Sequence, residues 1–331
     1  MMKKLVVSSV FFLLIVSLPL IALGKTKETS PYDMVTSDGE VVPYSEIENT
    51  AKSAGIKLPD KYVSGTGEKF DSKDFEKFDT SKLKPEKIFD KRTLLPAKID
   101  NSQIFKPTKV IGSDGRTKVK NTNVSPYKMI SYFYGENSKY SYTCTGNVIG
   151  KDMIITNAHC VYDTDEKQYI KYGYAIPGLN DSHYSYGAYE MKKYLVPQGY
   201  ISSKGSSQYD FAVIKLKPTP GKNIGDVVGV LPTKQVTNIK GTTISITGYP
   251  GDLSKKYGAV SQFGMSGKVT SEDKNVAYYS IDTASGQSGA AMLNSSGQII
   301  GLHNAAYSSG DNGGPKMTKP MRDFISYANT Q

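Results

Sequence analysis

A serine between glycines is the first candidate for chemistry in this sequence. Ser288 lies in the stretch 282–291, two residues after Gly286 and directly after an apolar run at 277–281 and its turn. Glycine has no Cβ, so the backbone can turn sharply there and leave a serine hydroxyl exposed. The N–H groups of Gly286 and Ser288 can then point at one spot, as the donors of an oxyanion hole do. Ser288 is therefore a candidate nucleophile.

The pattern Gly-x-Ser-Gly does not select Ser288 by itself, because the chain contains it twice. The second match is 264–267, where Ser266 stands between the glycines. Turns of this composition are common in proteins that make no chemical use of the serine. The choice between the two serines depends on the other residues that accompany them.

The chain has three histidines, and His159 is the candidate general base. It follows the apolar run 153–157 by two residues and stands directly before Cys160. A disulfide between Cys160 and Cys144 would hold this histidine beside a strand, and a base needs such a fixed orientation. A histidine after a strand can also be an ordinary surface or core residue. His183 lies in a loop rich in Tyr, Ser and Gly, and we expect it to be exposed and without a role.

Asp210 is the candidate partner of this histidine. It opens the apolar run 211–216, so its carboxylate is expected to be partly buried and to need a partner. The Nδ1–H of His159 would be such a partner, although an aspartate that caps a turn would fit the same position. The chain order His159, Asp210, Ser288 is one of the orders that catalytic triads take on β-barrels.

Short strands must position these residues. From Val110 onward the sequence alternates between segments rich in Val, Ile, Tyr and Thr and turns rich in Gly, Asn, Asp and Pro. This alternation of short strand-forming segments and turns over roughly 220 residues is typical of an all-β barrel or sandwich. The clearest expected strands are 127–134, 143–149, 153–157, 211–216, 242–248 and 277–281.

One helix is expected, at the C-terminus. Pro320 suits the first turn of a helix. Met321, Phe324, Ile325 and Ala328 follow at the spacing of one apolar helical face, which would pack on the body of the protein.

Residues 1–24 are predicted to be a signal peptide. Lys3 and Lys4 precede an apolar run that contains Pro19 and ends in small residues near Gly24. A membrane anchor is the alternative, since the run is near the lower length limit for spanning a bilayer. An exported protein with only two cysteines is expected to join them in one disulfide, here Cys144 with Cys160.

Residues 25–109 differ from the rest in composition. They are rich in Ser, Thr, Pro, Lys, Asp and Glu and have poor apolar periodicity, which indicates a pro-segment or a flexible arm. The formal charge of the chain is +10, but the basic residues are scattered, so nucleic-acid binding is not expected. We found no phosphate-binding loop, dinucleotide fingerprint or metal-ligand spacing. No cofactor is expected, and a structural calcium ion is left open.

Five short segments together carry a family resemblance: 143–146 (TCTG), 156–160 (TNAHC), 210–213 (DFAV), 248–251 (GYPG) and 286–289 (GQSG). They resemble the chymotrypsin-fold serine endopeptidases, and most of all the glutamyl endopeptidases of bacilli and staphylococci. The run 110–119 is similar to the mature N-terminus of the Bacillus enzymes. The resemblance implies an all-β fold of two packed antiparallel β-barrels with a C-terminal α-helix. It divides the chain into a signal peptide at 1–24, a propeptide at 25–109 and a protease domain at 110–331.

The resemblance also implies a role for each matching residue. His159 corresponds to the general base, Asp210 to the carboxylate that orients it, and Ser288 to the nucleophile. The N–H groups of Gly286 and Ser288 correspond to the oxyanion hole. Ser288 would attack the scissile carbonyl while His159 takes its proton and later returns it to the leaving amine.

Two further residues match the pocket that binds the substrate side chain before the cut bond, the P1 residue. Thr283 and His303 occupy the positions of a threonine and a histidine in glutamate-specific relatives. An imidazole and a hydroxyl can donate hydrogen bonds to a carboxylate without burying a permanent cation. The alternatives are a polar residue on a loop for His303 and ordinary strand or turn bonding for Thr283.

The chain departs from the wider family at two places. Trypsin-like enzymes have an acid before the nucleophile that binds the new N-terminus, whereas this chain has Gln287, so that ion pair cannot form. In staphylococcal relatives the mature N-terminus instead lies near the P1 carboxylate, and Val110 would be the matching residue here. Many relatives read Ser-Pro where this chain has Ala290 and Ala291, from which we expect no change in mechanism.

These observations predict a secreted, monomeric serine endopeptidase made as a zymogen, which cuts proteins and peptides after Glu and less readily after Asp. It would need an activating protease and no nucleic acid or membrane partner. The alternatives are the same triad with another P1 preference, or a barrel without catalysis, related to toxins, that binds protein.

Overall fold

The computed structural model describes residues 29–70, 109–181, 183–219 and 221–331. The predicted signal peptide at 1–24 and the segment 71–108 lie outside these residues. Among the helices in the described part of the chain, none has the length and apolar character to cross a membrane.

The first sheet closes into a barrel. Its strands lie in the order β11-β6-β5-β4-β9-β10, and β10 also pairs with β11. All of these pairings are antiparallel. Successive side chains of a strand point to opposite faces, so alternate apolar residues such as Phe133, Val148 and Ile214 fill the interior and are fully buried. The bounds are β4 (Ile130–Glu136), β5 (Ser141–Gly150), β6 (Met153–Thr156), β9 (Tyr172–Pro177), β10 (Tyr189–Pro197) and β11 (Ala212–Leu216).

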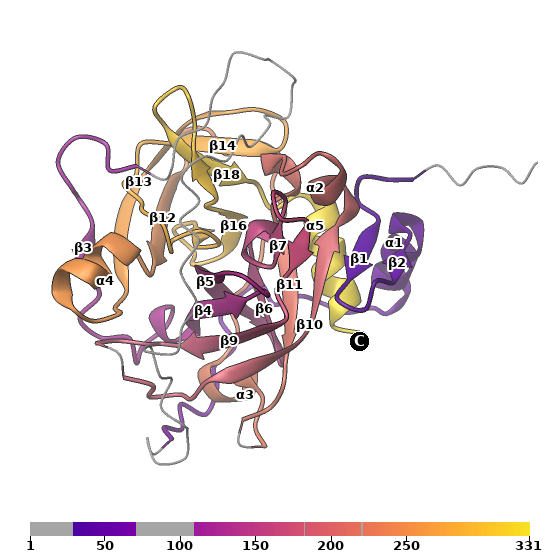
Figure 1. The fold of residues 1–331 in the computed structure, drawn as a ribbon, viewed down its shortest axis with the longest axis horizontal. Coiled ribbons are helices and arrows are strands. Elements are labelled where there is room, and N and C mark those ends of the chain that lie inside the picture. Colours follow the sequence, from indigo (N-terminus) through magenta and orange to yellow (C-terminus); the bar gives the residue numbers. More distant parts are fainter. Residues whose placement is uncertain (1–28, 71–108, 182, 220) are drawn as a thin grey trace, which may run out of the picture.

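The second sheet curls into a half-barrel. Its order is β16-β15-β12-β13-β14-β18-β17, and β3 pairs with the start of β13. Ile246, Met292 and Ile300 belong to its buried interior. The bounds are β3 (Thr117–Lys118), β12 (Thr243–Gly248), β13 (Phe263–Glu272), β14 (Val276–Tyr279), β15 (Ala291–Leu293), β16 (Ile299–Leu302), β17 (Ala305–Ala306) and β18 (Asn312–Pro315). Figure 1 shows the two sheets side by side, with β12, β13, β14 and β18 in one and β4, β5, β6, β9, β10 and β11 in the other.

The expected all-β fold with a C-terminal helix is confirmed. Each of the six strands expected from the sequence lies within or over a strand of the structure, although 127–129 form a short 3₁₀ turn, η3, ahead of β4. The terminal helix is α5 (Lys319–Ala328), and its predicted apolar face is fully buried: Met321, Phe324, Ile325 and Ala328. The other helices of this domain are short: α2 (Gln198–Ser202), α3 (Ile224–Val228) and α4 (Gly251–Tyr257).

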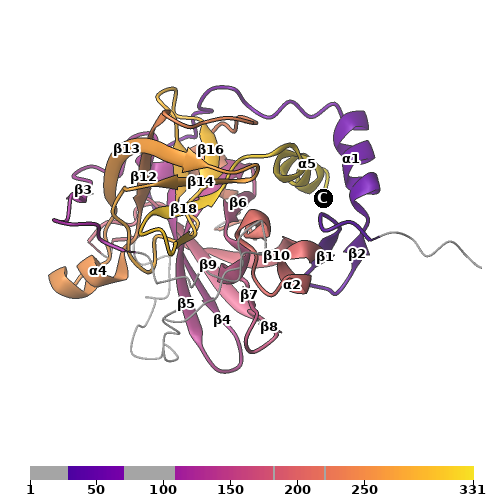
Figure 2. The same ribbon diagram turned by 90° about the horizontal axis from the view of Figure 1, so that it is seen from above.

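Residues 29–70 have a defined structure, a point that the sequence left open. They form β1 (Met34–Thr36), β2 (Val41–Val42) and α1 (Tyr44–Ser53). The apolar pattern is weak because β1 has only three residues and α1 buries only Ile47. These elements form against the rest of the protein: β1 pairs with β10, and α1 stands beside α5 in both views (Figures 1 and 2).

Candidate active site

His159 and Asp210 are brought together by the pairing of two strands. The last residue of β6, Thr156, lies opposite the first residue of β11, Ala212. Because the strands are antiparallel, the residues that follow β6 and those that precede β11 leave the sheet at the same end of this strand pair. His159 lies in the turn η4 (Ala158–Cys160), and Asp210 ends the turn η5 (Ser207–Tyr209).

The contact between these two side chains is direct. His159 Nδ1 lies 2.8 Å from Asp210 Oδ2, and the His159 backbone N–H donates to Oδ1 at 3.0 Å. Asn157 Nδ2 donates to the Asp210 carbonyl at 2.7 Å. Asp210 is fully buried and His159 is 3% exposed, so little solvent screens the pair. Two bonds to one carboxylate fix both the backbone and the ring of His159.

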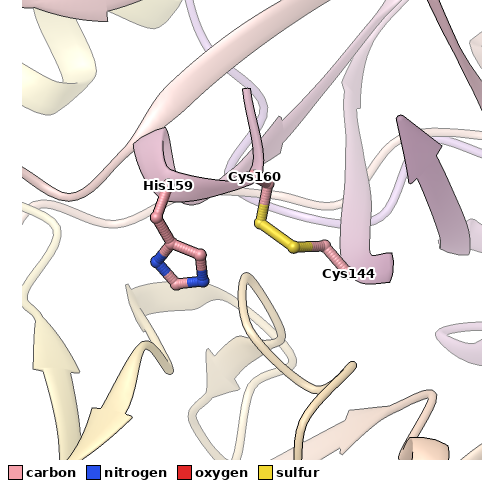
Figure 3. A group of neighbouring side chains, drawn as sticks. All are labelled: Cys144, His159 and Cys160. Atoms are coloured by element: carbon pink, nitrogen blue, oxygen red, sulfur yellow. A yellow bond between two sulfur atoms is a disulfide. The ribbon is translucent and has the colours of Figure 1, made fainter. Parts of the chain in front are cut away.

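The disulfide predicted from the sequence is present. Cys144 and Cys160 are joined, with their Cα atoms 6.2 Å apart. Figure 3 shows that the bridge leaves the same short turn as the His159 ring and ties it to β5. Among the described residues, Cys144, His159 and Cys160 are the one group of metal-ligating side chains close enough to share an ion. The two sulfurs are bonded to each other, so the group offers no thiolate ligands.

Strand β5 of the first barrel also holds the turn that carries Ser288. Thr145 N donates to the Ser288 carbonyl at 2.8 Å, and Thr145 Oγ1 donates to the Gly286 carbonyl at 2.9 Å. Asn147 Nδ2 donates to the Gly289 carbonyl at 2.7 Å. Thr145 and Asn147 are fully buried. The serine turn therefore comes from the second sheet in sequence but is fastened to the first barrel.

The turn leaves two backbone donors available. Gly286 has φ +94°, and a Cβ there would lie 2.3 Å from the Tyr249 carbonyl oxygen. Gln287 N donates to the Ala284 carbonyl. Among the described residues, the N–H groups of Gly286 and Ser288 have no hydrogen-bond acceptor. Two free N–H groups on one turn fit the requirement for stabilising an oxyanion.

Asn304 joins the serine to the aspartate. Its carbonyl accepts a long hydrogen bond from Ser288 Oγ, at 3.5 Å, and its Nδ2 donates to Asp210 Oδ2 at 3.2 Å. Tyr307 Oη in turn donates to Asn304 Oδ1 at 3.0 Å. Ser288 is 7% exposed. His159, Asp210 and Ser288 thus belong to one buried network.

The two residues proposed for the P1 pocket are both fully buried, and they precede and follow the serine turn in the sequence. His303 N donates to the Ala290 carbonyl, and its own carbonyl accepts from Gly289 N, each at 2.8 Å. Its Nδ1 lies 2.8 Å from Tyr279 Oη. Within the described part of the chain, His303 Nε2 and Thr283 Oγ1 have no hydrogen-bond partner. Buried polar atoms without partners are uncommon and call for an explanation.

Burial keeps both His303 and Tyr279 uncharged. Desolvation, together with the nearby His159, lowers the pKa of His303 to about 3. Burial also raises the pKa of Tyr279 well above its usual value, so Tyr279 keeps its phenolic proton. Tyr279 Oη can donate to Nδ1, and in that tautomer the proton of the neutral imidazole sits on Nε2, which is then a hydrogen-bond donor.

The segment around Val110 lies beside Thr283. Thr283 N donates to the Lys109 carbonyl at 3.3 Å, and Asn312 bonds both the N–H and the carbonyl of Lys109 at 3.2 and 2.7 Å. Ile111 N donates to Asp282 Oδ1 at 2.6 Å. Val110 is therefore next to the proposed pocket while the chain is still continuous. His183 is exposed and makes a bridge with Asn180, apart from the residues of the site.

Sequence reasoning missed the residues that hold the site together. Thr145, Asn147 and Asn304 make the bonds between the two barrels, yet each stands in a strand or strand end where polar residues are ordinary. The signal for Thr145 and Asn147 was weak: they are alternate polar residues in an otherwise buried strand, next to Cys144. Asn304 directly follows His303, but only the fold brings it to Asp210.

The comparisons with known proteins agree with this geometry. The family model described as Trypsin matches residues 115–327. The chain is 34% identical over 228 residues to the glutamyl endopeptidase of Bacillus licheniformis, covering 66% of this chain and 68% of that relative. It is 31% identical over 234 residues to a Bacillus subtilis protein named extracellular metalloprotease, covering 69% of this chain and 72% of that relative.

A solved structure, of a Glu endopeptidase in complex with MPD, is 52% identical to this chain with a TM-score of 0.62. The match covers 67% of this chain and all of the solved one. The two-barrel architecture described above is the chymotrypsin-like fold of these relatives.

Proposed function

Because this chain belongs to the trypsin family of serine endopeptidases, we propose that it is an exported glutamyl endopeptidase, made as a zymogen, which cuts after Glu and less readily after Asp. The observation that carries the proposal is the pair of buried polar atoms without a partner among the described residues, His303 Nε2 and Thr283 Oγ1, on residues that precede and follow Ser288 in the sequence. A substrate carboxylate would supply the missing acceptor for both.

In this proposal Ser288 is the nucleophile and His159 the general base. Asp210 fixes the ring through Nδ1 at 2.8 Å, so Nε2 can take the serine proton and later give it to the leaving amine. The N–H groups of Gly286 and Ser288 stabilise the negative charge on the tetrahedral carbon's oxygen, and one such donor contributes about 10²–10³-fold in rate. Water then hydrolyses the acyl-enzyme.

His303 and Thr283 select the P1 side chain. A neutral imidazole that donates from Nε2 and a hydroxyl that donates from Oγ1 favour an anionic carboxylate, and they bury no permanent cation when the pocket is empty. A substrate with an apolar P1 residue would leave both donors unpaired, which costs free energy. This difference is the physical basis of the Glu preference.

The propeptide is 25–109, and the proposed cut lies between Lys109 and Val110. Freeing the Val110 amine would add a positive charge beside Thr283, where the segment already lies. We expect this amine to complete the acid-binding pocket. A mature form extended by a few residues before Val110 tests the idea, because full activity with unchanged Glu preference would contradict it.

The proposal of export rests on the predicted signal peptide at 1–24 and on the similarity to an extracellular relative. N-terminal sequencing of protein recovered from culture medium would locate both processing sites. Recovery of the protein only with membranes, with residues 1–24 still attached, would support the anchor alternative.

Cleavage of a mixed peptide library by the mature form tests the function. We expect cuts after Glu, a loss of about 10⁶-fold in kcat for Ser288→Ala, and a loss of about 10- to 100-fold in the preference for Glu over neutral P1 residues for His303→Ala. His183→Ala is the matched control, because this histidine is exposed.

The outcomes separate the alternatives. Cuts after other residues by the wild type would keep the triad and reject the P1 pocket. No cut by a correctly processed chain, with no labelling of Ser288 by a fluorophosphonate, would support the protein-binding barrel without catalysis.

A further inference from the structure

Residues 29–70, here called the arm, bind the protease domain at several places; three of them carry the argument, and the first is a sheet edge. β1 extends the first barrel by pairing with β10, with Met34, Val35 and Thr36 opposite Pro197, Val196 and Leu195. The carbonyls of Pro31 and Asp33 accept hydrogen bonds from Gly199 and Gln198, each at 2.7 Å. Met34 is fully buried. Such main-chain pairing is the way in which extended peptides bind an exposed sheet edge.

The second place is the C-terminal helix. α1 lies against α5, and Ile47 of α1 is fully buried. Tyr44 Oη donates to Asp323 Oδ2, and Lys319 Nζ lies 2.9 Å from Glu48 Oε1. The helix pair therefore combines one buried apolar anchor with polar contacts at its rim.

The third place is the loop after α3. Val63 and Val230 exchange two backbone hydrogen bonds, at 3.1 and 2.8 Å. Gly67 N donates to the Val227 carbonyl at 2.7 Å. All three contacts join segments that are far apart in sequence, and none depends on the peptide bond between Lys109 and Val110.

The arm lies away from the proposed P1 pocket. α1 and α4 are at opposite ends of the longest axis (Figures 1 and 2). Gly251, the first residue of α4, donates its N–H to the Ser285 carbonyl at 2.7 Å. The arm approaches the triad at Tyr32, whose ring packs on Tyr209, directly before Asp210, with centroids 5.2 Å apart. The arm therefore packs against the residue that precedes Asp210.

We infer that the arm stays bound to residues 110–331 after the chain is cut before Val110, as a second, non-covalent chain. The edge of β10 and the face of α5 form its binding surface, which accepts a short strand followed by an amphipathic helix. The match to the solved relative that is 52% identical covers 67% of this chain and all of that one, so a domain of this kind is stable as a chain of its own. The arm is therefore a separable ligand, and none of its contacts described above involves Thr283 or His303.

The test uses the full chain with Ser288→Ala, so that it does not depend on the proposed activity. A recognition site for a sequence-specific protease is inserted directly before Val110, and the cut protein is studied by size-exclusion chromatography and native mass spectrometry. We expect the two fragments to elute together and to show the mass of a complex with one copy of each. Separate elution at micromolar concentration would overturn the inference.

Two variants test the surface. Ile47→Asp places a charge at a buried contact and should raise the Kd of the cut complex by roughly 100-fold. Val41→Asp is the control, because Val41 is on the same arm and is 55% exposed. Equal retention of both variant fragments would contradict the assigned surface. Circular dichroism of each uncut chain shows that the protease domain is folded.

A buried arginine, Arg116, lies beside the turn that carries Ser288. Its side chain is fully buried and is bonded by two carboxylates: Nε and Nη2 to Asp114 at 2.9 Å, and Nη1 and Nη2 to Asp252 at 3.0 and 2.6 Å. Nη1 also donates to Gln287 Oε1 at 3.4 Å. Gln287 is the residue directly before Ser288, where trypsin-like enzymes carry an acid.

The turn that carries the oxyanion donors is fixed around this contact. Gln287 Oε1 accepts a second bond, from Ala284 N at 3.0 Å, while Gln287 N donates to the Ala284 carbonyl. Asp252 stands in the first turn of α4, next to Gly251, which bonds Ser285. The buried guanidinium therefore contacts the turn 284–288 directly at Gln287, and it also binds Asp252, whose neighbour Gly251 bonds Ser285.

We propose that Arg116 is a positioning residue for the oxyanion turn, in place of the ion pair that an N-terminal amine makes in trypsin-like enzymes; this rests on the proposed function. The contact is present in the uncut chain, so the turn is set before activation. Cutting before Val110 then acts on the P1 pocket and not on the oxyanion turn.

Steady-state kinetics per titrated active site tests the role. Arg116→Met should lower kcat about 10²-fold with little change in KM, and should weaken a peptide aldehyde inhibitor by the same factor, because the donors act on the oxyanion. Arg116→Lys should recover part of the loss. An unchanged kcat in the titrated, folded fraction would overturn the proposal. A wild type that is not labelled at Ser288 would instead overturn the proposed function.

Discussion

The His303 imidazole shows how burial gives a residue its chemistry. In water a histidine is partly charged near neutral pH, but here desolvation lowers its pKa to about 3. The neutral ring keeps one donor on Nε2 and leaves it without a partner among the described residues. The residue is thus suited to meet an anion that arrives with the substrate.

The same shift makes stability depend on pH. The unfolded chain takes up a proton on His303 below the ordinary histidine pKa of 6.5, whereas the folded chain does so only near pH 3. Protonation therefore favours the unfolded state, and His303 lowers stability as the pH falls from 6.5 toward 3. We expect it to contribute up to ~1.4 kcal/mol per pH unit to this loss.

Urea denaturation between pH 4 and 7, in the Ser288→Ala background to prevent autolysis, measures the effect. The slope of the free energy of unfolding against pH should be smaller in His303→Gln than in the parent. His183→Gln is the control and should keep the parent slope, since this histidine is exposed. Equal slopes for all three proteins would show that His303 is not buried as neutral imidazole.

At the scale of the element, the serine turn depends on a residue without a side chain. Gly286→Ala would meet the Tyr249 carbonyl oxygen at 2.3 Å as well as strain a positive φ of +94°. If the N–H groups of this turn form the oxyanion hole, as proposed, moving one donor should cost about 10²–10³-fold in kcat. Kinetics per titrated active site measures the loss.

Gly258→Ala is the matched control for the turn. Gly258 also has a positive φ, +67°, but a Cβ there meets nothing within 4 Å. It should cost about 1 kcal/mol in stability and leave kcat unchanged. A similar kcat for both alanine variants would mean that backbone strain, not the position of the turn, decides activity.

The disulfide ties η4, which carries His159, to β5, which fastens the serine turn. The two cysteines are 16 residues apart, so a loop of this length should contribute about 3 kcal/mol to the free energy of unfolding. The variant Cys144→Ala/Cys160→Ala, compared with its parent in the Ser288→Ala background, tests this by urea denaturation. A loss well below about 1 kcal/mol would show that the strand pairing alone holds the turn.

At the scale of the whole molecule, α5 returns from the second sheet to pack on the first barrel. Phe324 contacts Phe211, with ring centroids 5.2 Å apart, and Phe211 directly follows Asp210. Phe324 is fully buried. The end of the chain therefore supports the base of the active site from behind, on the same side as the arm.

Phe324→Ala should lower the free energy of unfolding by about 3 to 5 kcal/mol, because it leaves a cavity in this junction. Thermal melting of the Ser288→Ala protein measures it, with exposed Gln331→Ala as the control. A shift no larger than that of the control would mean that α5 is not needed for the junction.

The sequence by itself determined much of the protease domain. Alternating apolar residues and Gly or Asn turns predicted six strands that the structure contains, and the apolar face of 321–328 predicted the last helix. These patterns are local, so a strand or helix can be recognised before its partners are known. The two cysteines left only one pairing within the chain. A catalytic triad needs a Ser, a His and an Asp, and with three histidines in the chain this limited the candidate residues.

The tertiary structure shows the physical difference between the two Gly-x-Ser-Gly segments, of which sequence could select Ser288 only by the residues that accompany it. Ser266 lies within β13, opposite Ser245 and exposed, whereas Ser288 lies on a turn held by Thr145 of another barrel. The arm is a second example, since β1 and α1 have too few apolar residues to predict and form against β10 and α5. The register of distant strands decides which polar groups meet, and no local pattern contains that register.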